Sequence, residues 1–146
     1  MNRRTYALAL ALAGSTLFAT GCANMASSPS AANPSRVVIQ VSDGDAGKWN
    51  LALNNAKNVQ TDLGADKVKI EIVAFGPGIG MLTADSVTAE RINEAVKSGV
   101  QVAACENTMR AAKLTKADMN PSVGYVPSGV VEIIKRQQEG WVYLRP

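Results

Sequence analysis

The sequence predicts a three-layer α/β sandwich, in which helices cover both faces of a parallel sheet. Two observations support this fold class. Short runs rich in β-branched residues alternate with longer segments whose apolar residues recur at helical spacing. Turn signals separate these segments, and no internal repeat or second domain is visible. Alternating strands and helices are typical of parallel sheets with right-handed crossovers.

The first 22 residues have the layout of a secretory signal peptide. An arginine pair precedes residues 6–19, an uncharged run rich in alanine and leucine that is short for a membrane span. The small residues before Cys22 resemble the lipobox of bacterial lipoproteins, although Ala19 stands where leucine is usual. Cleavage by a plain signal peptidase near Ala23 or Ala26 is the alternative. We expect export to the periplasm or cell envelope, with membrane attachment only through a lipid anchor on Cys22.

Residues 23–35 are rich in serine and proline without apolar periodicity, so we expect a flexible linker. The globular domain is expected at residues 36–146. Arg3 and Arg4 are two of the 15 Lys and Arg residues, which leaves 13 in this domain against 12 Asp and Glu. A nearly neutral domain without a basic stripe does not favour nucleic-acid binding. The chain has no histidine, which excludes Ser-His-Asp triads, Cys-His pairs and histidine metal sites.

The first strand is predicted at residues 36–41, which are rich in β-branched residues, and residues 42–45 carry turn and helix-start signals. The helix that follows is expected to cover one face of the sheet and to end at the cap residue Gly64. Its apolar positions at helical spacing are Trp49, Leu53, Ala56, Val59 or Gln60, and Leu63.

The second strand is predicted at residues 67–75. Two lysines and Glu71 alternate with apolar residues, which indicates one wetter face, whereas the apolar run at 73–75 indicates burial on both sides. The glycines and proline of residues 76–80 predict a tight turn with unusual dihedral angles. This segment lacks the Lys-Ser/Thr pair of a Walker A loop and the spacing of a dinucleotide fingerprint.

The same alternation continues to the end of the chain. The expected elements are a helix that buries Val87, Ile92, Ala95 and Val96 and ends at Gly99, a strand at 100–104, a helix around 107–113, a helical turn with capping-box spacing at 115–118, a small strand at 124–126, a helix from Ser128 to Gly140, and a last strand at 141–144.

Cys105 is the residue with the clearest chemical potential, because it follows a buried strand and precedes a helical pattern. Parallel sheets bind ligands at the carboxyl ends of their strands. Free backbone N–H groups and the positive end of a helix dipole favour a thiolate there. The alternative is structural, since free cysteine often packs as a small buried hydrophobe. If Cys22 is acylated or removed, Cys105 has no intramolecular partner.

The carboxyl ends of the first three strands are expected to form a rim that holds a small anionic or sulfur-bearing group. The rim residues are Asp43, Gly44, Gly76, Pro77, Gly78, Glu106, Asn107 and Thr108. A purely structural role stays open for them. In that case Asp43 caps the first helix, Asn107 and Thr108 cap the third, and the glycines serve only the turn.

Three stretches, taken in order, resemble the DsrE/DsrF-like family across the domain. They are residues 73–78 (VAFGPG), 102–110 (VAACENTMR) and 129–141 (GVVEIIKRQQEGW). The resemblance implies a mostly parallel, flavodoxin-like sheet of about five strands, assembled as a homo-oligomer, often a trimer or hexamer. It also implies that Cys105 carries sulfur as a persulfide. Many members have histidine where Phe75 stands, and the best-understood relays of the family are cytoplasmic, so their donors and acceptors do not carry over.

The leading hypothesis is an exported DsrE-like protein that uses Cys105 as a sulfur carrier or redox thiol, exchanging sulfur with a donor or an acceptor thiol. No metal or organic cofactor is required. The alternative is a non-catalytic oligomeric module of the cell envelope that binds a small ligand or acts as a scaffold, with Cys105 as core packing. Whether the protein turns over a substrate stays open.

Overall fold

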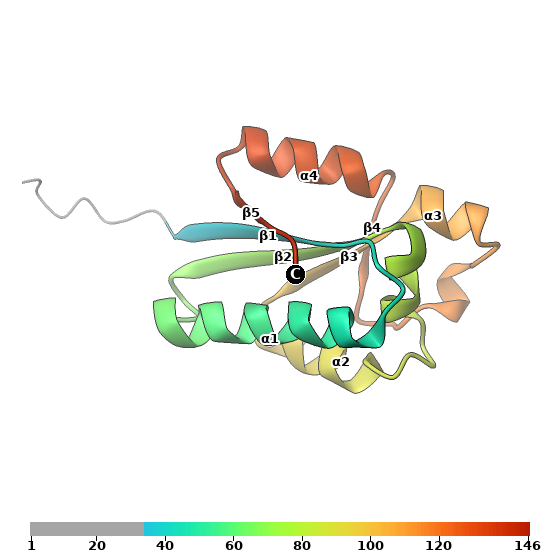
Figure 1. Cartoon of the computed structure of the whole chain (residues 1–146), viewed down its shortest axis with the longest axis horizontal. Coiled ribbons are helices and arrows are strands. Elements are labelled where there is room, and N and C mark those ends of the chain that lie inside the picture. The colour runs from blue at the N-terminus through green and yellow to red at the C-terminus, as the bar shows by residue number, and fades with distance from the viewer. Residues whose placement is uncertain (1–33) are drawn as a thin grey trace, which may run out of the picture. The chain divides into compact units, whose positions relative to one another are not determined.

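The computed structural model describes residues 34–146, which form a five-stranded, all-parallel sheet between two layers of helices (Figure 1). The strands are β1 (Ser35–Val41), β2 (Val68–Ala74), β3 (Gln101–Cys105), β4 (Gly124–Val126) and β5 (Val142–Leu144), in the order β4-β3-β2-β1-β5. The predicted α/β fold class is confirmed. The predicted signal peptide, Cys22 and most of the predicted linker lie outside the described residues.

The strand order accounts for the placement of the main helices. From β1 to β4 each connection advances by one strand, and right-handed crossovers in one direction place α1 (Ala46–Leu63) and α2 (Ala89–Lys97) on the same face. The connection from β4 to β5 returns across β3, β2 and β1, so α4 (Gly129–Gln138) lies on the opposite face. Figure 1 shows α1 and α2 below the sheet and α4 above it.

Shorter helices follow the other strands. A 3₁₀ helix, η1 (Gly76–Leu82), occupies the segment where the sequence predicts a tight turn, and only its first glycine has a positive φ, of 53°. The helix α3 (Glu106–Ala111) starts directly after β3. The predicted capping box is confirmed in η2 (Lys116–Asp118), where Thr115 and Asp118 bond reciprocally. Within residues 34–146, every helix is too short or too polar to cross a membrane.

The two faces of the sheet have separate hydrophobic cores. The larger core lies under α1 and α2 and includes Leu53, Ile39, Ile72 and Ile92, all nearly inaccessible to solvent. The smaller core lies under α4 and consists of Val38, Val73, Ala103, Ile133 and Trp141, with Phe75 and Val126 packed against it.

Three sequence-based expectations about burial are wrong. Val87 is 79% exposed because it lies in the turn before α2, one residue ahead of the helix cap. Leu63 is 48% exposed at the last position of α1. Glu71 is only 3% exposed, since α4 covers the face of β2 that the lysine and glutamate alternation had indicated as wet.

Candidate functional site

Cys105 lies at the carboxyl edge of the sheet, between β3 and α3. It is both the last residue of β3 and the residue that caps the start of α3. It pairs in register with Val126 of β4, and the chain continues from there into α4, which begins at Gly129. The first turns of α3 and α4 therefore flank one cysteine, at the carboxyl edge where open α/β sheets bind ligands.

Hydrogen-bond donors converge on the sulfur of Cys105. The backbone N–H of Gly76 donates to Thr108 Oγ1 at 3.0 Å, which leaves the Thr108 hydroxyl proton available to the thiol. Burial alone raises the pKa of Cys105, but hydrogen bonds from the Thr108 hydroxyl and from the N–H groups of Gly129, Thr108 and Asn107 outweigh it. The net effect is a pKa below the usual value of a cysteine thiol, which favours the thiolate.

The thiol is more deeply placed than the sequence predicts. Cys105 is 3% exposed, rather than lying at an open edge. A Cβ added to Gly129 would lie 2.9 Å from Phe75 Cδ1 and 3.3 Å from Cys105 Cβ, so only glycine fits at this position without displacement. Phe75 is itself partly exposed and lies between solvent-accessible surface and the smaller core. The Phe75 ring and Cys105 thus both lie against Gly129 at the start of α4.

The loops of the predicted rim do meet. A Cβ on Gly44 would lie 3.3 Å from Pro77 Cβ, which places the loop after β1 against η1. Gly78 packs so closely on the backbone of Val41 that a side chain would collide with it. Together with the bond between Gly76 and Thr108, these contacts join the carboxyl ends of β1, β2 and β3.

The charged and amide side chains of the rim point to other partners. Asp43 accepts from Arg145 at 3.4 Å, and Glu106 pairs with Lys116 at 4.0 Å. The Asn107 side chain accepts from Arg110, and its backbone N–H, which faces the cysteine, donates to the Pro127 carbonyl at 3.2 Å. The first helix is capped by Asp45 rather than Asp43, through a 2.9 Å bond from the N–H of Lys48.

Sequence reasoning missed Gly129 as a donor, and it noted Phe75 only as the position where many family members have histidine. The available signal was the small residue directly after Pro127-Ser128, where a helix was expected to start. Its proximity to Cys105 depends on the pairing of β4 with β3, which no local pattern reveals.

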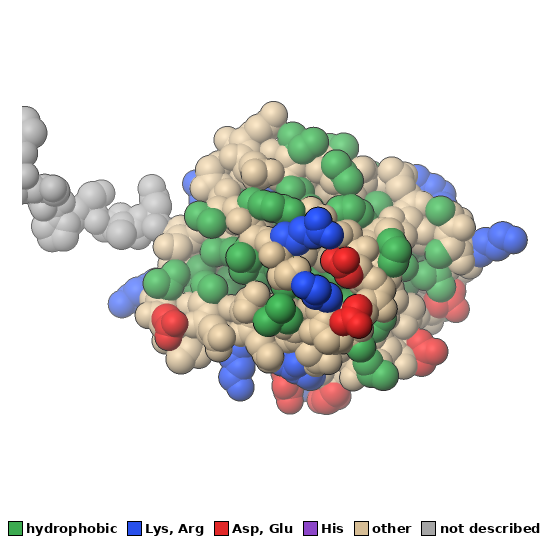
Figure 2. All heavy atoms as spheres, in the orientation of Figure 1, with side chains coloured by type: hydrophobic (Ala, Val, Ile, Leu, Met, Phe, Trp, Pro, Cys, Tyr) green, Lys and Arg blue, Asp and Glu red, His purple; other side chains and the backbone are tan. Residues whose placement is uncertain are grey.

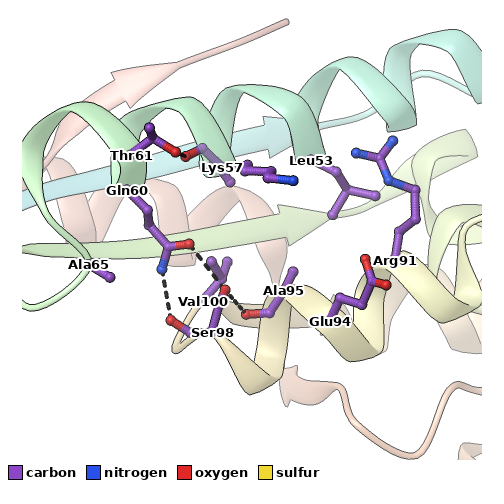
Figure 3. Close-up of a pocket in the computed structure, with 11 residues that line it drawn as sticks. Leu53, Lys57, Gln60, Thr61, Ala65, Arg91, Glu94, Ala95, Ser98 and Val100 are labelled. Carbon is purple, nitrogen blue, oxygen red and sulfur yellow. Dashed lines mark hydrogen bonds between the residues drawn. The ribbon is translucent and has the colours of Figure 1, made fainter.

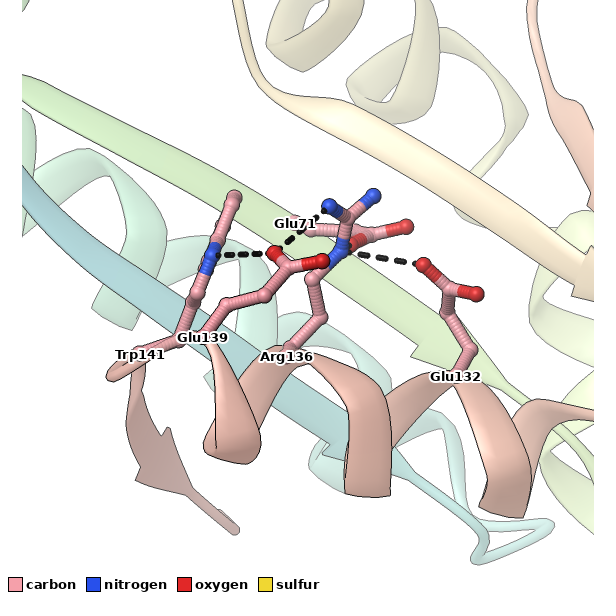
Figure 4. Close-up of polar contacts among 5 residues, drawn as sticks. All are labelled: Glu71, Glu132, Arg136, Glu139 and Trp141. Atoms are coloured by element: carbon pink, nitrogen blue, oxygen red, sulfur yellow. Dashed lines mark hydrogen bonds and ion pairs between the residues drawn. The ribbon is translucent and has the colours of Figure 1, made fainter.

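A second polar cluster, which we call the Arg136 cluster, lies beneath α4. It consists of Arg136, Glu71, Glu132, Glu139 and Trp141 (Figure 4). Arg136 Nε lies 2.5 Å from Glu71 and 2.9 Å from Glu132, and its guanidinium stacks on Trp141. Burial raises the pKa of Glu71 by more than Arg136 lowers it.

Within residues 34–146, no group of three or more His, Cys, Asp or Glu side chains is placed to hold a metal ion.

The sequence model of the DsrE/DsrF-like family matches residues 35–146, the whole of the folded domain. The chain belongs to this family. The predicted resemblance is therefore confirmed, and the family is associated with sulfur relay. Among curated proteins, none matches this chain.

Solved structures place this DsrE-like domain among similar folds. The protein of unknown function MTH1491 from Methanobacterium thermoautotrophicum is 38% identical, with a TM-score of 0.73 over 77% of this chain and 99% of that one. BT1422 from Bacteroides thetaiotaomicron, also of unknown function, is 15% identical with a TM-score of 0.63 over 76% and 94% of the two chains. The ychN protein from E. coli is 12% identical with a TM-score of 0.64 over 77% and 99%. The last two similarities show the fold alone.

Proposed function

We propose that this DsrE-like protein is exported and carries sulfane sulfur on Cys105. The observation that carries the proposal is the position of Cys105 at the start of α3 and against Gly129 at the start of α4, where the Thr108 hydroxyl and the backbone N–H groups of Thr108 and Gly129 face its sulfur. A structural cysteine packed as a hydrophobe needs no such set of donors. The same donors suit a persulfide anion, which also bears its charge on sulfur.

The transfer is a pair of displacements that needs no external oxidant. The Cys105 thiolate attacks the outer sulfur of a donor persulfide, a new S–S bond forms, and the donor leaves as a thiolate with the electron pair of the broken bond. An acceptor thiolate then attacks the outer sulfur on Cys105, and the Cys105 thiolate is released. The N–H groups and Thr108 stabilise negative charge on sulfur at both stages.

Access to Cys105 in this scheme requires the Phe75 side chain to move. Phe75 is partly exposed and lies against Gly129 beside the cysteine, so a rotation of its ring uncovers the sulfur without unfolding the sheet. Phe75→Ala is expected to accelerate alkylation of Cys105 by iodoacetamide. An unchanged rate would mean that the entry path lies elsewhere.

The central test is persulfidation of the purified protein. After incubation with a low-molecular-weight persulfide, intact-mass and peptide mass spectrometry are expected to show one added sulfur on the peptide that contains Cys105. Cys105→Ser is the control, and peptide mapping separates sulfur on Cys22. A Cys105 that iodoacetamide alkylates but that takes up no sulfur would eliminate the sulfur-carrier role.

The electrostatic part of the proposal is tested at Thr108. Thr108→Val removes the hydroxyl donor, so the pKa of Cys105 is expected to rise and the pH profile of alkylation to move to higher pH. Thr61→Val, on the exposed side of α1, is the matched control and is expected to leave the profile unchanged. Identical profiles for both variants would remove Thr108 from the site.

The protein is also proposed to assemble as a homo-oligomer. The exposed apolar residues on α4 and β5 form what we call the α4 surface: Val130, Val131, Ile134, Val142 and Tyr143, each 39–64% exposed. In Figure 2, hydrophobic side chains gather along the upper edge over α4. Such a group of exposed apolar side chains is typical of an interface. Because Val130 follows Gly129 directly, a neighbouring subunit on this surface lies beside Cys105.

Sedimentation velocity tests the assembly. Val130→Ser with Ile134→Ser is expected to reduce the oligomer to monomers, whereas Val87→Ser, which changes the most exposed valine outside the α4 surface, is expected to leave the assembly intact. A wild-type monomer at all concentrations would contradict this part of the proposal.

Two further possibilities follow from the deep position of Cys105 and from Cys22. The 3% exposure of Cys105 favours a non-catalytic ligand-binding or scaffold module as the alternative function. A Cys105→Ala protein that keeps its assembly and its cellular role would support that alternative.

Globomycin-sensitive processing in cells would support lipid attachment at Cys22, and processing that is insensitive to globomycin would support a soluble exported form.

A further inference from the structure

A groove lies between α1 and α2, and none of the residues that line it belongs to the rim around Cys105. Its volume is about 390 Å³, at the small end of the range for small-molecule sites (Figure 3). An apolar floor is provided by Leu53 and Ala56 of α1, Ala95 of α2, and Val100 just before β3. Because Ala56 and Ala95 end at Cβ, the two helices leave space between them that larger side chains would fill.

The guanidinium of Arg91, which has no acidic partner among residues 34–146, lies at the rim of this groove. Arg91 Nη1 donates to Asn50 Oδ1 at 2.5 Å and to the Asn50 carbonyl at 3.5 Å, and Nη2 donates to Asn54 Oδ1 at 2.7 Å. Both amides are neutral, so they hold the side chain in place without neutralising its charge. Two of the five N–H groups of the Arg91 guanidinium make no hydrogen bond to residues 34–146.

Lys57 adds a second cation to the rim. Figure 3 shows its side chain lying along the groove, from α1 toward Leu53 and Arg91. Lys57 makes no ion pair within the described part of the chain. Glu94 is the one carboxylate among the residues that line the groove, and it makes no ion pair with Arg91 or Lys57. The rim therefore has two positive charges and one negative charge.

A hydrogen-bonded bridge fixes the width of the groove. Gln60 Nε2 of α1 donates to the Ser98 carbonyl at 2.8 Å, and the Ser98 hydroxyl is shared between the Ala95 carbonyl at 2.7 Å and Gln60 Oε1 at 3.1 Å (Figure 3). Arg91 joins the same two helices farther along, through Asn50 and Asn54. The two connections hold the helices apart at a set separation, so the site is formed before any ligand arrives.

We propose that this groove binds a small amphipathic monocarboxylate of the medium-chain fatty acid type. The aliphatic tail lies on the floor made by Leu53, Ala56 and Ala95, and the carboxylate lies between Arg91 and Lys57. A single negative charge matches the net charge of the rim, and Glu94 disfavours a dianion. An inorganic anion would leave the apolar floor unused, and a cation would face two positive side chains.

The experiment is isothermal titration of the full-length protein with octanoate, and with octan-1-ol and octylamine as uncharged and cationic analogues. Octanoate is expected to bind at one saturable site, octan-1-ol at least about tenfold more weakly, and octylamine not measurably. Equal affinity for octanoate and octan-1-ol, or no saturable octanoate binding, would overturn the proposal.

Variants separate this groove from other surfaces. Lys57→Gln changes a side chain without recorded hydrogen bonds, so the fold is retained, and octanoate affinity is expected to fall about threefold. Arg91→Gln is expected to weaken binding about tenfold. Ala95→Leu fills the groove and is expected to abolish binding. Lys97→Gln, an exposed lysine on α2 that does not line the groove, is the control, and a loss of affinity there equal to that of Lys57→Gln would reject the site.

Discussion

The helices α1 and α2 cover one face of the sheet, and the single helix α4 covers the other. Under α1 and α2 the core is large and mostly apolar, and Ile39, Ile72 and Ile92 have no accessible surface; its buried polar residues, Thr88 and Asn120, are neutral and hydrogen-bonded to backbone carbonyls. Under α4 the apolar core is small, and the remaining volume holds the Arg136 cluster with its buried Glu71. The difference comes from the strand order, because three crossovers proceed in one direction and only the last one returns.

This contrast separates stability from assembly. Apolar burial stabilises the α1 and α2 face, whereas a buried ion pair adds little net stability, since desolvation offsets the attraction between its charges. The α4 helix also presents Val130, Val131 and Ile134 to solvent within five residues, whereas the exposed Leu51 and Leu63 of α1 are twelve residues apart. We infer that the first face holds the subunit together and that the second face is completed by a neighbouring chain.

The largest expected effect comes from matched isoleucine truncations in the two cores. Ile39→Ala is expected to lower the free energy of unfolding by about 4 kcal/mol and Ile133→Ala by about 2 kcal/mol. Ile133 is 6% exposed in the smaller core and lies on a helix that can shift to close the cavity. Urea denaturation monitored by tryptophan fluorescence measures both values. Equal losses would show that the two cores contribute alike.

The next effect concerns the cation of the Arg136 cluster. Arg136→Met is expected to lower stability by about 3 kcal/mol, because Glu71 is left buried without its partner. The double variant Glu71→Leu with Arg136→Met removes both charges and is expected to regain most of this loss. A double variant as unstable as Arg136→Met alone would mean that packing against Trp141 matters more than charge.

The smallest effect is a pH dependence at Glu71. Its pKa is higher in the folded chain than its usual value of 4.5, so the folded state binds this proton more tightly. Ionisation of Glu71 therefore lowers stability as the pH rises above 4.5. Glu71→Gln is expected to exceed the wild type by up to about 1 kcal/mol at neutral pH, with the difference vanishing toward pH 4.5.

Denaturation midpoints measured from pH 4.5 to 7 provide this comparison. Glu90→Gln, which changes an exposed glutamate on α2, is the control and is expected to show no such trend. A stability difference that grows as the pH falls would contradict the raised pKa of Glu71.

Local patterns predicted the elements well. Gly64 ends α1 with a positive φ of 93°, and the Thr115–Asp118 capping box forms as its spacing indicates. Glu71 shows the limit of such patterns. Alternation along β2 identifies the two faces of the strand, but it cannot tell whether a helix from elsewhere in the chain covers the polar one.

The candidate site shows the same division. The position of Cys105 at the end of a strand was predictable, because the apolar run before it and the helical pattern after it are both local. The depth of the thiol was not predictable, since Phe75 and Gly129 reach it from other elements. The groove between α1 and α2 gave no sequence signal either, because Lys57 and Arg91 belong to different helices.

The order of residues by itself determined the strands and helices, the family, and the placement of a lone domain cysteine at a strand end, since these depend on periodicity and caps within short segments. Tertiary structure alone decided the strand order, the burial of Glu71, the donors around Cys105 and the cations at the groove. The physical reason is that such features depend on which segments pack together. That choice is made by the free energy of the whole fold and by the handedness of its crossovers.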